Sequence, residues 1–483
     1  MDFPIFHLDF LGNRLLIAID AILHVLINHS FAVGGLPLVA LLEWTGMRSG
    51  DRRWDDLAYH ILKVFFIITT TVGALTGVGV WFAASLVNPA SIASLIRVFF
   101  WGWFTEWLVF VTEVSLILVY FLTWPKSNAT PETKRKHLKF GTFLAVFSWI
   151  TMAIIVAILG FMMDPGNWLT HHGLLIGFLN PIYGPQLVFR TTVAMVMGGL
   201  VVGALTYAYT KRDLPFRQQA LKSVSTWTGL WIIPVCIAGY WYYNAVPKTM
   251  IGNLPVALGT QAFANWYAGF KVMLMVGPLL AAAVLAGNYF KPGRVPVAVY
   301  LVPVVLMFAL LGQFERVREF IRKPYVIGNY MYANGIRVED YPLLQRDGIL
   351  KYATYARVRT ITPENQLQAG REVFILACTR CHTVAGVNSV RAKLQGMYGD
   401  NSWNADAIAA YVDNIHGARN YMPPFPGNQL ELKALGAWLA SLQAHRDTLE
   451  GVQTIGIPEP DAEARGNDAS ATQHSTTHSS GAQ

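Results

Sequence analysis

Long apolar runs separated by short polar loops dominate the first two thirds of the chain. Eight of these runs are long enough to cross a bilayer, because a spanning helix needs about 20 mostly apolar residues. They lie roughly at 15–44, 57–87, 97–123, 138–163, 186–209, 224–245, 264–288 and 297–319. Backbone polar groups inside a membrane must be satisfied within the segment. The runs therefore predict an all-α, polytopic helix bundle over residues 1–330.

The apolar runs stop near residue 330, and the pattern becomes that of a small helical domain outside the membrane. Residues 331–362 are mixed and are expected to form a linker. Amphipathic stretches at 363–377 and 429–443 predict the first and last helices of a compact all-α domain over 363–446. The tail, 447–483, is rich in Ser, Thr, Ala and Gly and is expected to be disordered.

The composition agrees with a membrane protein. Hydrophobic residues make up 53% of the 483 residues and charged residues only 14%, which is too apolar for a soluble chain of this length. The formal charge is +8, but the basic residues lie in short loops between apolar runs and form no nucleic-acid-binding patch. We therefore expect a membrane environment and no nucleic-acid partner.

The distribution of Lys and Arg among the loops predicts the orientation of the bundle. One set of alternate loops holds most of them: Arg48, Arg52, Arg53, Lys126, Lys134, Arg135, Lys136, Lys139, Lys211, Arg212, Arg217, Lys222, Lys291 and Arg294. Basic loops face the cytoplasm. Both termini and the C-terminal domain are therefore expected on the periplasmic side of a bacterial inner membrane. No basic segment with a cleavage site precedes the first run, which we expect to act as its own insertion signal.

The motif 378-CTRCH-382 indicates the chemistry of the C-terminal domain. Cys-x-x-Cys-His attaches haem covalently, here through Cys378 and Cys381, and His382 becomes the proximal iron ligand. Met422, in 420-NYMPPF-425, is the expected distal ligand, since the prolines that follow it hold the loop extended. An iron with both ligands bound has no open site and carries electrons. A cytochrome c domain is thus expected over 363–446.

A zinc site or a disulfide at Cys378 and Cys381 is the alternative. A zinc site would need a second Cys/His pair downstream, and only the isolated His416 is there. Haem c remains the interpretation that accounts for the whole motif.

Ionisable residues inside the apolar runs are costly in hydrocarbon and indicate either a function or a buried ion pair. Glu106 and Glu113 lie seven residues apart in the third run, so both carboxylates face one side of a helix. They are candidate catalytic acids on a proton route, and pairing with an inward Arg or Lys is the alternative. His24 and His29 lie in the outer half of the first run, and each is either a metal ligand or a packed hydrogen-bonding residue.

In order along residues 15–330, these features resemble the large, haem-bearing subunit of cytochrome bd quinol oxidases. The stretch 21-AILHVLINHSFAVGG resembles the family's first span, where a histidine binds the haem that reduces oxygen. The match implies His24, with His29 as a rival. The segment 73-GALTGVGVWF is similar to the second span, and 104-FTEWLVFVTEVSLILVYFLTW to the third, which carries two acids near the oxygen site. These acids fall on Glu113, in register, and on Glu106, one position off.

Two later segments extend the resemblance. In 270-FKVMLMVG the methionine ligand of the low-spin haem b falls on Met273, with Lys271 where the family has arginine. The segment 319-EFIRKPYVIG is similar to the family's E-x-x-R-Q-P-W-x-I-G, in which the glutamate ligates the high-spin haem b. That glutamate falls on Glu319 and the arginine on Arg322. The resemblance thus implies one or more haem b or d groups, with iron ligands among His24, Glu319 and Met273.

Three departures from the family bear on function. The low-spin haem histidine is expected just after 180-NPIYGPQLVF, where this chain has Arg190. The outer loop that helps to bind quinol shrinks to 247–261, and the family's final span is replaced by the C-terminal domain. His171 and His172, in the loop after the fourth run, are either substitute ligands or surface residues.

Two functions fit this pattern. In the first, a periplasmic electron-transfer protein or enzyme reduces haem c, electrons pass to membrane haems, and the chain is part of a cytochrome c-fed terminal oxidase that reduces O2. In the second, the chain is a non-oxidase subunit that relays electrons between the quinone pool and a periplasmic enzyme or cytochrome. A membrane anchor that has lost its membrane haems is a third reading. The resemblance also implies a second membrane subunit as partner.

Overall fold

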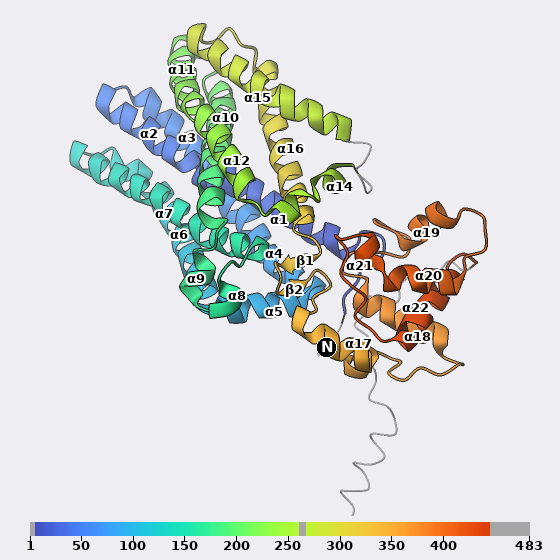
Figure 1. Cartoon of the computed structure of the whole chain (residues 1–483). Helices are drawn as coiled ribbons and strands as arrows, with labels where there is room; N and C mark the ends of the chain where they lie inside the picture. Colours follow the sequence, from blue (N-terminus) through green and yellow to red (C-terminus); the bar gives the residue numbers. More distant parts are fainter. Residues whose placement is uncertain (1–4, 260–266, 445–483) are drawn as a thin grey trace, which may run out of the picture. The chain divides into compact units, whose positions relative to one another are not determined.

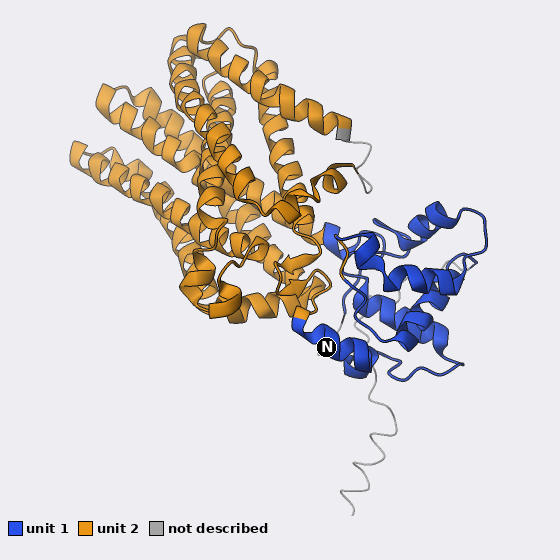
Figure 2. Ribbon diagram, in the orientation of Figure 1, with its two compact units in different colours: residues 1–15, 339–420, 424–483 blue, residues 16–338, 421–423 orange. Residues whose placement is uncertain are grey.

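The computed structural model describes residues 5–259 and 267–444 and divides into two compact units (Figure 2). The membrane unit comprises Leu16–Val338 and the short segment Tyr421–Pro423. The C-terminal unit comprises Glu339–Asn420, the described chain from Pro424 on, and the N-terminal segment up to Leu15. The first residues of the chain are therefore part of the C-terminal unit.

Among the described residues of the membrane unit, eight helical segments are long and apolar enough to cross a membrane, which confirms the expected all-α, multi-pass bundle. Two of them contain a π-helix, η1 or η2. In order (Figure 1), the segments are α1–η1–α2 (Asn13–Ile27, Asn28–Val33, Gly35–Ser49), α3–η2–α4 (Arg52–Ile68, Thr69–Gly73, Ala74–Val87), α6 (Phe100–Ser127), α7 (Pro131–Met163), α10 (Tyr183–Tyr209), α11–α12 (Leu214–Leu230, Ile232–Ala245), α15 (Tyr267–Phe290) and α16 (Val297–Ile321).

Shorter elements join the spans. They are α5 (Pro89–Val98), α8 (Trp168–His171), α9 (Leu174–Phe178), α13 (Lys248–Ile251), α14 (Leu254–Gly259) and an antiparallel pair of strands, β1 (Tyr325–Ile327) and β2 (Met331–Tyr332). The strands follow α16 directly, and Ser91 of α5 donates a hydrogen bond to the Met331 sulfur at 3.2 Å. This pair of strands therefore packs on α5.

Polar residues begin the spans that follow the basic loops. The side chains of Asp51, Thr130 and Asp213 accept hydrogen bonds from backbone N–H groups in the first turns of α3, α7 and α11. Such caps satisfy N–H groups that the helix itself leaves without a partner. They explain why α7 and α11 start at Pro131 and Leu214, before the apolar runs begin.

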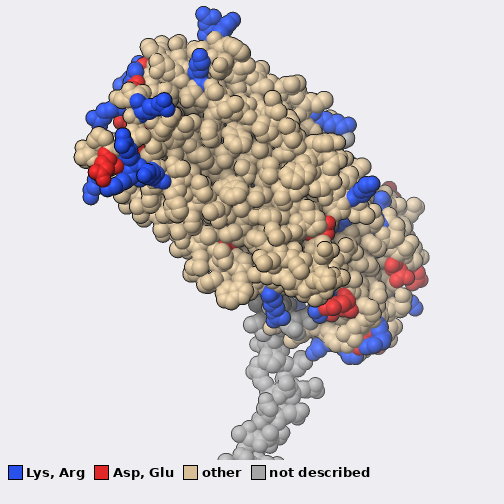
Figure 3. Space-filling view, turned by 60° about the vertical axis from the view of Figure 1, so that its left-hand side comes forward, with Lys and Arg blue, Asp and Glu red and all other residues tan. Residues whose placement is uncertain are grey.

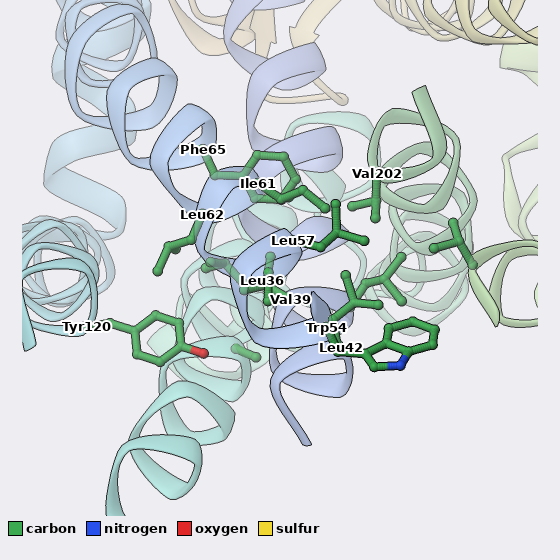
Figure 4. Close-up of a cluster of buried hydrophobic side chains, with 14 of the residues drawn as sticks. Leu36, Val39, Leu42, Trp54, Leu57, Ile61, Leu62, Phe65, Tyr120 and Val202 are labelled. Carbon is green, nitrogen blue, oxygen red and sulfur yellow. The ribbon is translucent and has the colours of Figure 1, made fainter. Parts of the chain in front are cut away.

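The core of the bundle is a continuous apolar cluster between α2, α3, α6 and α10 (Figure 4). Leu36, Leu42, Ile61 and Phe65 are all at most 1% exposed. Fully burying such a side chain stabilises the fold by about 1.5–3 kcal/mol. Large apolar side chains on α6, α12 and α15 are instead exposed on the outside of the unit, as is expected of helices in contact with lipid or with another membrane subunit.

Two glycines allow α10 to cross the first span at very short range. A Cβ atom on Gly34 would lie 1.8 Å from the Ala194 carbonyl oxygen, and one on Gly198 would lie 2.2 Å from the Gly34 carbonyl carbon. No side chain fits at either position. This close crossing brings α10 next to η1, and hence Arg190 next to His29.

A buried ionic cluster joins α2, α3, α6 and α7 at the end of the unit that carries the basic loops. Glu43, fully buried, accepts hydrogen bonds from the Tyr120 hydroxyl and the His137 Nδ1, each at 2.6 Å, and lies 2.8 Å from Lys134 Nζ. Lys134 also pairs with Asp55. The His137 Nε2 faces the Tyr120 carbonyl, so both ring nitrogens face acceptors. Two carboxylates, a lysine and a histidine from three helices thus meet in one buried network.

We expect Glu43→Gln to lower the free energy of unfolding by about 3–5 kcal/mol, because it leaves buried cations without their counter-charge. Urea or thermal unfolding of the detergent-solubilised protein, followed by circular dichroism, measures this change. Glu132→Gln, which breaks the exposed pair with Lys136, is the control and should leave stability unchanged. Equal stability of the two variants would mean that the cluster is not ionic.

The basic loops gather at one end of the membrane unit (Figure 3). Arg53, at the start of α3, pairs with Asp213 of the α10–α11 loop at 3.0 Å, and Lys222 of α11 lies over the Tyr289 ring of α15. Loops far apart in sequence therefore meet on a single face.

The C-terminal unit is a small bundle of helices. They are α17 (Tyr341–Asp347), α18 (Gln366–Ala377), α19 (Val390–Tyr398), α20 (Ala405–Asp413), α21 (Ile415–Ala418) and α22 (Gln429–Ser441), with 3-10 turns at Val338–Asp340 and Leu350–Tyr352. The first and last long helices, α18 and α22, pack together, and the rings of Phe374 and Trp438 lie 4.9 Å apart at their interface. Trp438 lies in the core of the unit.

Part of the stretch expected to be a linker, 331–362, is folded. Its backbone N–H groups at Ile349 and Leu350 donate to the buried Glu431 carboxylate of α22 at 2.9 and 2.8 Å. Glu431 also accepts from the N-cap residue Asn428. The sequence could not reveal this because the contact joins residues about 80 positions apart. The expected disordered tail, 447–483, lies outside the described residues.

Candidate functional site

The Cys-x-x-Cys-His motif forms a tight turn at the end of α18. The backbone N–H groups of Cys381 and His382 both donate to the Cys378 carbonyl, at 3.0 and 2.9 Å. Both thiols are free and half-buried. Burial, with a smaller contribution from Cys381, raises the pKa of the Cys378 thiol to about 12. Two free thiols at this spacing, followed directly by a histidine, fit thioether attachment of haem.

His382 is oriented as an iron ligand. Its Nδ1 donates to the Asn388 carbonyl at 3.3 Å, which leaves Nε2 as the free lone pair. Burial, helped by Lys393 and Arg14, lowers the pKa of His382 to about 4. The ring is therefore neutral at pH 7, as ligation requires. These residues fit a c-type haem.

Met422, the expected distal ligand, lies in the segment Tyr421–Pro423, which groups with the membrane unit. There the Tyr421 ring lies 5.6 Å from the Phe320 ring of α16. Its role as an iron ligand stays a prediction.

Met422→Ala is expected to leave haem c covalently attached, to lower its midpoint potential, and to open the iron to carbon monoxide, because a thioether ligand favours the ferrous state. Spectroelectrochemistry and a CO-difference spectrum of the c-type band measure both effects. Met397→Ala, at an exposed position on α19, is the control. An unchanged potential and spectrum would assign the distal position to another residue.

His24 has the geometry of a histidine ligand in the membrane unit. Its Nδ1 lies 3.2 Å from the Gly73 carbonyl of the π-helix η2 and 3.2 Å from the Thr76 hydroxyl, and in the described part of the chain no protein group bonds to its Nε2. A carbonyl can only accept, so Nδ1 carries the proton and the Nε2 lone pair is free. A Cβ on Gly77 would lie 3.0 Å from the His24 ring, so the glycine leaves room for it.

Asp20 is an acid that the sequence analysis missed. It lies one turn before His24 on α1, and a buried oxygen of its carboxylate has no hydrogen-bond partner among the residues that the structure describes. A Cβ on Gly79 would lie 2.7 Å from that carboxylate, so Gly77 and Gly79 of α4 together accommodate His24 and Asp20. The i, i+4 spacing of an acid and a histidine within an apolar run was the signal that could have identified it.

His29, the rival ligand, contacts Arg190 of α10 through its ring. It lies on η1, is 3% exposed, and its Nε2 is 3.5 Å from Arg190 Nη1 on α10. A guanidinium only donates, so the Nε2 lone pair of His29 points to Arg190 and is not free for iron. The geometry therefore favours His24 over His29.

Arg190 occupies the position where the resembled family has its low-spin haem histidine. It is 2% exposed and pairs with Glu315 of α16 at 2.6 Å, and Glu315 also accepts from Arg318 at 2.9 Å. Arg190 therefore pairs with neither Glu106 nor the proposed substitute ligands His171 and His172. This position does not fit an iron ligand, because a guanidinium cannot ligate iron. Arg318 is also largely buried in this network.

Glu319 retains the donor atoms of a ligand. Its carboxylate is partly exposed, lies 2.5 Å from Arg322 Nη2 and 3.6 Å from Lys323 Nζ, and keeps lone pairs free for a metal. Arg322 is fixed by a 2.6 Å hydrogen bond to the Val326 carbonyl. Helices α1 and α16 pack against a common cluster that includes Leu26 and Phe314. The candidate ligands His24 and Glu319 thus lie on helices that share this cluster.

Glu106 and Glu113 lie on one face of α6, about 10 Å apart along the axis. The hydroxyls of Ser148 and Thr151 on α7 face the Glu113 carboxylate. Tyr120 continues the same face toward the ionic cluster of Glu43.

The remaining predicted residues are Lys271, Met273, His171 and His172. Lys271 is exposed and Met273 partly buried on α15, which packs on α11 and α16. His171 and His172 are exposed, and the His172 ring lies 4.9 Å from the Trp168 ring. The exposure of His171 and His172 agrees with a surface role.

Two protein-family models match the chain over different residues. The model described as cytochrome bd terminal oxidase subunit I matches residues 13–249, and the model described as cytochrome C oxidase, cbb3-type, subunit III matches residues 365–439. Among solved structures, the chain is similar to the bd oxidase from Geobacillus thermodenitrificans, with a TM-score of 0.55 and 16% identity over 67% of this chain and 90% of that chain. A search of curated proteins returns no match.

The bd-type match covers His24, Glu106, Glu113 and Arg190 and stops before Glu319. The structural likeness, at 16% identity, concerns the fold. These comparisons agree with the resemblance drawn from the motifs and with a haem-bearing membrane cytochrome. The individual iron ligands stay predictions.

Proposed function

Because the chain joins a membrane domain of the cytochrome bd oxidase subunit I type to a C-terminal cytochrome c domain, we propose that it is the catalytic subunit of a terminal oxidase fed by cytochrome c. Electrons from a periplasmic donor protein would enter at the haem bound by Cys378, Cys381 and His382 and pass to haem in the membrane unit. The observation that carries this proposal is the pairing of a complete haem c motif with the loss of the low-spin haem position at Arg190.

Two features of the membrane unit argue against direct oxidation of quinol. The Arg190–Glu315 pair fills the place where the resembled family receives electrons from quinol. The described part of the shortened loop, 247–259, also contacts the end of α16, where the buried Asn253 donates to the Ile321 and Lys323 carbonyls at 3.0 and 2.7 Å. A new electron donor is therefore needed, and the added haem c supplies one.

In this proposal, a membrane haem with an open coordination position supplies the reduction of O2. His24 and Glu319 would hold such groups, with the Gly73 carbonyl fixing the His24 ring. Glu113 and Glu106 would pass protons along α6 to the site, with Ser148 and Thr151 orienting the proton at Glu113. Asp20 would provide a further acid one helical turn from His24.

The charge distribution supports an orientation for the complex. The single face that carries the basic loops would be cytoplasmic. The N-terminal segment and the cytochrome c domain belong to one unit, which supports placing both on the same side of the membrane, the periplasmic side. The apolar outer faces of α6, α12 and α15 leave room for a second membrane subunit.

The test is oxygen uptake by the purified, haem-replete membrane complex. Soluble c-type cytochrome kept reduced by ascorbate should support uptake, and a soluble quinol should not. A Cys378→Ser/Cys381→Ser double variant is expected to lose cytochrome-driven uptake while keeping its membrane haem spectrum. Uptake driven only by quinol would contradict the proposal. Absence of uptake, with no CO-sensitive haem, would instead make the chain an electron-relay subunit.

A further inference from the structure

The N-terminal segment is folded against the haem c motif, at the opposite end of the sequence. Asp9 is 3% exposed, and its carboxylate accepts hydrogen bonds from the backbone N–H groups of Val384 at 2.7 Å and Ala385 at 3.2 Å. These residues come two and three positions after His382. His7, also fully buried, lies 3.2 Å from the same carboxylate.

The segment is shaped for this contact by its own hydrogen bonds. Asn13, at the start of α1, donates to the Phe6 carbonyl at 2.7 Å and accepts from the Leu8 N–H at 3.1 Å. Gly12 adopts a left-handed backbone, φ +81°, which lets the chain turn into α1. These bonds hold residues 6–13 as a compact loop with Asp9 at its tip.

The opposing loop permits the close approach. A Cβ on Gly386 would lie 1.9 Å from the Asp9 carbonyl oxygen and 2.6 Å from the Phe10 carbonyl oxygen, so only glycine fits there. On the other side of the loop, the methyl carbon of Thr383 would be 3.2 Å from a Cβ on Gly12. The contact is thus a packed interface, which includes backbone and side-chain contacts as well as the hydrogen bonds of the Asp9 carboxylate.

The loop that Asp9 holds also orients the axial histidine. Asn388 accepts from His382 Nδ1 through its carbonyl and donates to the Cys381 carbonyl through its side chain at 2.6 Å. Within the same loop, Thr383 donates to the Val387 carbonyl at 2.9 Å, and the Val390 N–H donates to the Thr383 carbonyl at 2.9 Å. Asp9 satisfies the N–H groups of Val384 and Ala385 in the middle of this loop.

The carboxylate of Asp9 is ionised in this setting. Burial raises its pKa, but the hydrogen bond from His7 and the two backbone N–H donors lower it by more, so the pKa lies below its ordinary value. A fixed negative charge behind the axial histidine favours the ferric over the ferrous iron, because the ferric form carries one more positive charge.

We propose that Asp9 is a positioning residue for haem c, and that the N-terminal segment is an integral part of the cytochrome c domain. Since α1 begins at Asn13, the segment joins that domain covalently to the first span, in addition to its connection through the last span. The domain is therefore attached to the membrane part at two points. The proposal rests on haem attachment at Cys378 and Cys381, which haem staining of a denaturing gel tests separately.

The test uses Asp9→Asn in the full complex, with Asp400→Asn as the control, since Asp400 is an exposed aspartate of the same domain. Two quantities are measured: the midpoint potential of the c-type band, and hydrogen–deuterium exchange of residues 5–12 and 383–387. Asp9→Asn should raise the potential and speed exchange in both segments on the order of tenfold. The control should change neither.

Gly386→Ala separates packing from charge, because its Cβ would displace the segment while Asp9 keeps its carboxylate. Gly386→Ala should speed hydrogen–deuterium exchange in the same segments. If the Asp9→Asn protein does not accumulate, exchange in Gly386→Ala alone tests whether the N-terminal segment packs on this loop. The proposal is overturned if exchange in both variants equals that of the control. It is also overturned if Asp9→Asn speeds exchange but leaves the potential unchanged, since the segment would then be structural only.

Discussion

Replacement of His24 by alanine is expected to abolish oxygen uptake, with a loss of more than about 100-fold, and to remove a CO-sensitive haem from the membrane unit. Changes to groups that merely orient a metal ligand cost 10–100-fold, so loss of the ligand itself should cost more. The His24 Nδ1 is fixed by the Gly73 carbonyl, while no described protein group bonds to its Nε2. Haem c should remain attached and reducible.

Two further variants make this prediction specific. His60→Ala, at an exposed histidine of α3, should have no effect on haem content or activity. His29→Gln should keep the haem, because the His29 Nε2 already faces Arg190. If His29→Gln loses the CO-sensitive haem and His24→Ala retains it, the ligand assignment is wrong and the first span binds haem through its π-helix.

Glu113→Gln is expected to slow oxygen uptake by about 100-fold or more while haem c is still reduced at the parent rate. A positioned acid or base contributes typically 10²–10⁴-fold to a proton transfer, and glutamine cannot carry the proton. Stopped-flow reduction of haem c and steady-state oxygen uptake measure the two steps separately. Glu132→Gln, in an exposed pair at the start of α7, is the matched control. Parent-like uptake by Glu113→Gln would remove this carboxylate from the proton route.

The spans were predictable because hydrocarbon imposes both helical structure and length. The residues at which the spans begin and end were less predictable. Helices α7 and α11 extend beyond the apolar runs because Thr130 and Asp213 cap them in the polar region. The haem c motif was equally clear, since its residues are adjacent in sequence and their chemistry does not depend on distant contacts.

Contacts between distant residues lay beyond the sequence. The choice between His24 and His29 depends on the contact of Arg190 with the His29 Nε2. Arg190 lies on a helix more than 150 residues away in the sequence. The pairing of Glu43 with His137 and that of Asp9 with Val384 likewise join remote segments. In each case the residue type was visible, but its partner was set by helix packing.

Flow-flash kinetics test the central claim, that haem c delivers electrons to a membrane haem that reduces O2. The fully reduced, CO-bound complex is mixed with O2, the CO is released by a laser flash, and the c-type band is followed. The account predicts that haem c becomes oxidised in the same reaction in which the membrane haem reacts with O2, and that His24→Ala abolishes this signal. Haem c that stays reduced while the membrane haem reacts with O2 would contradict it.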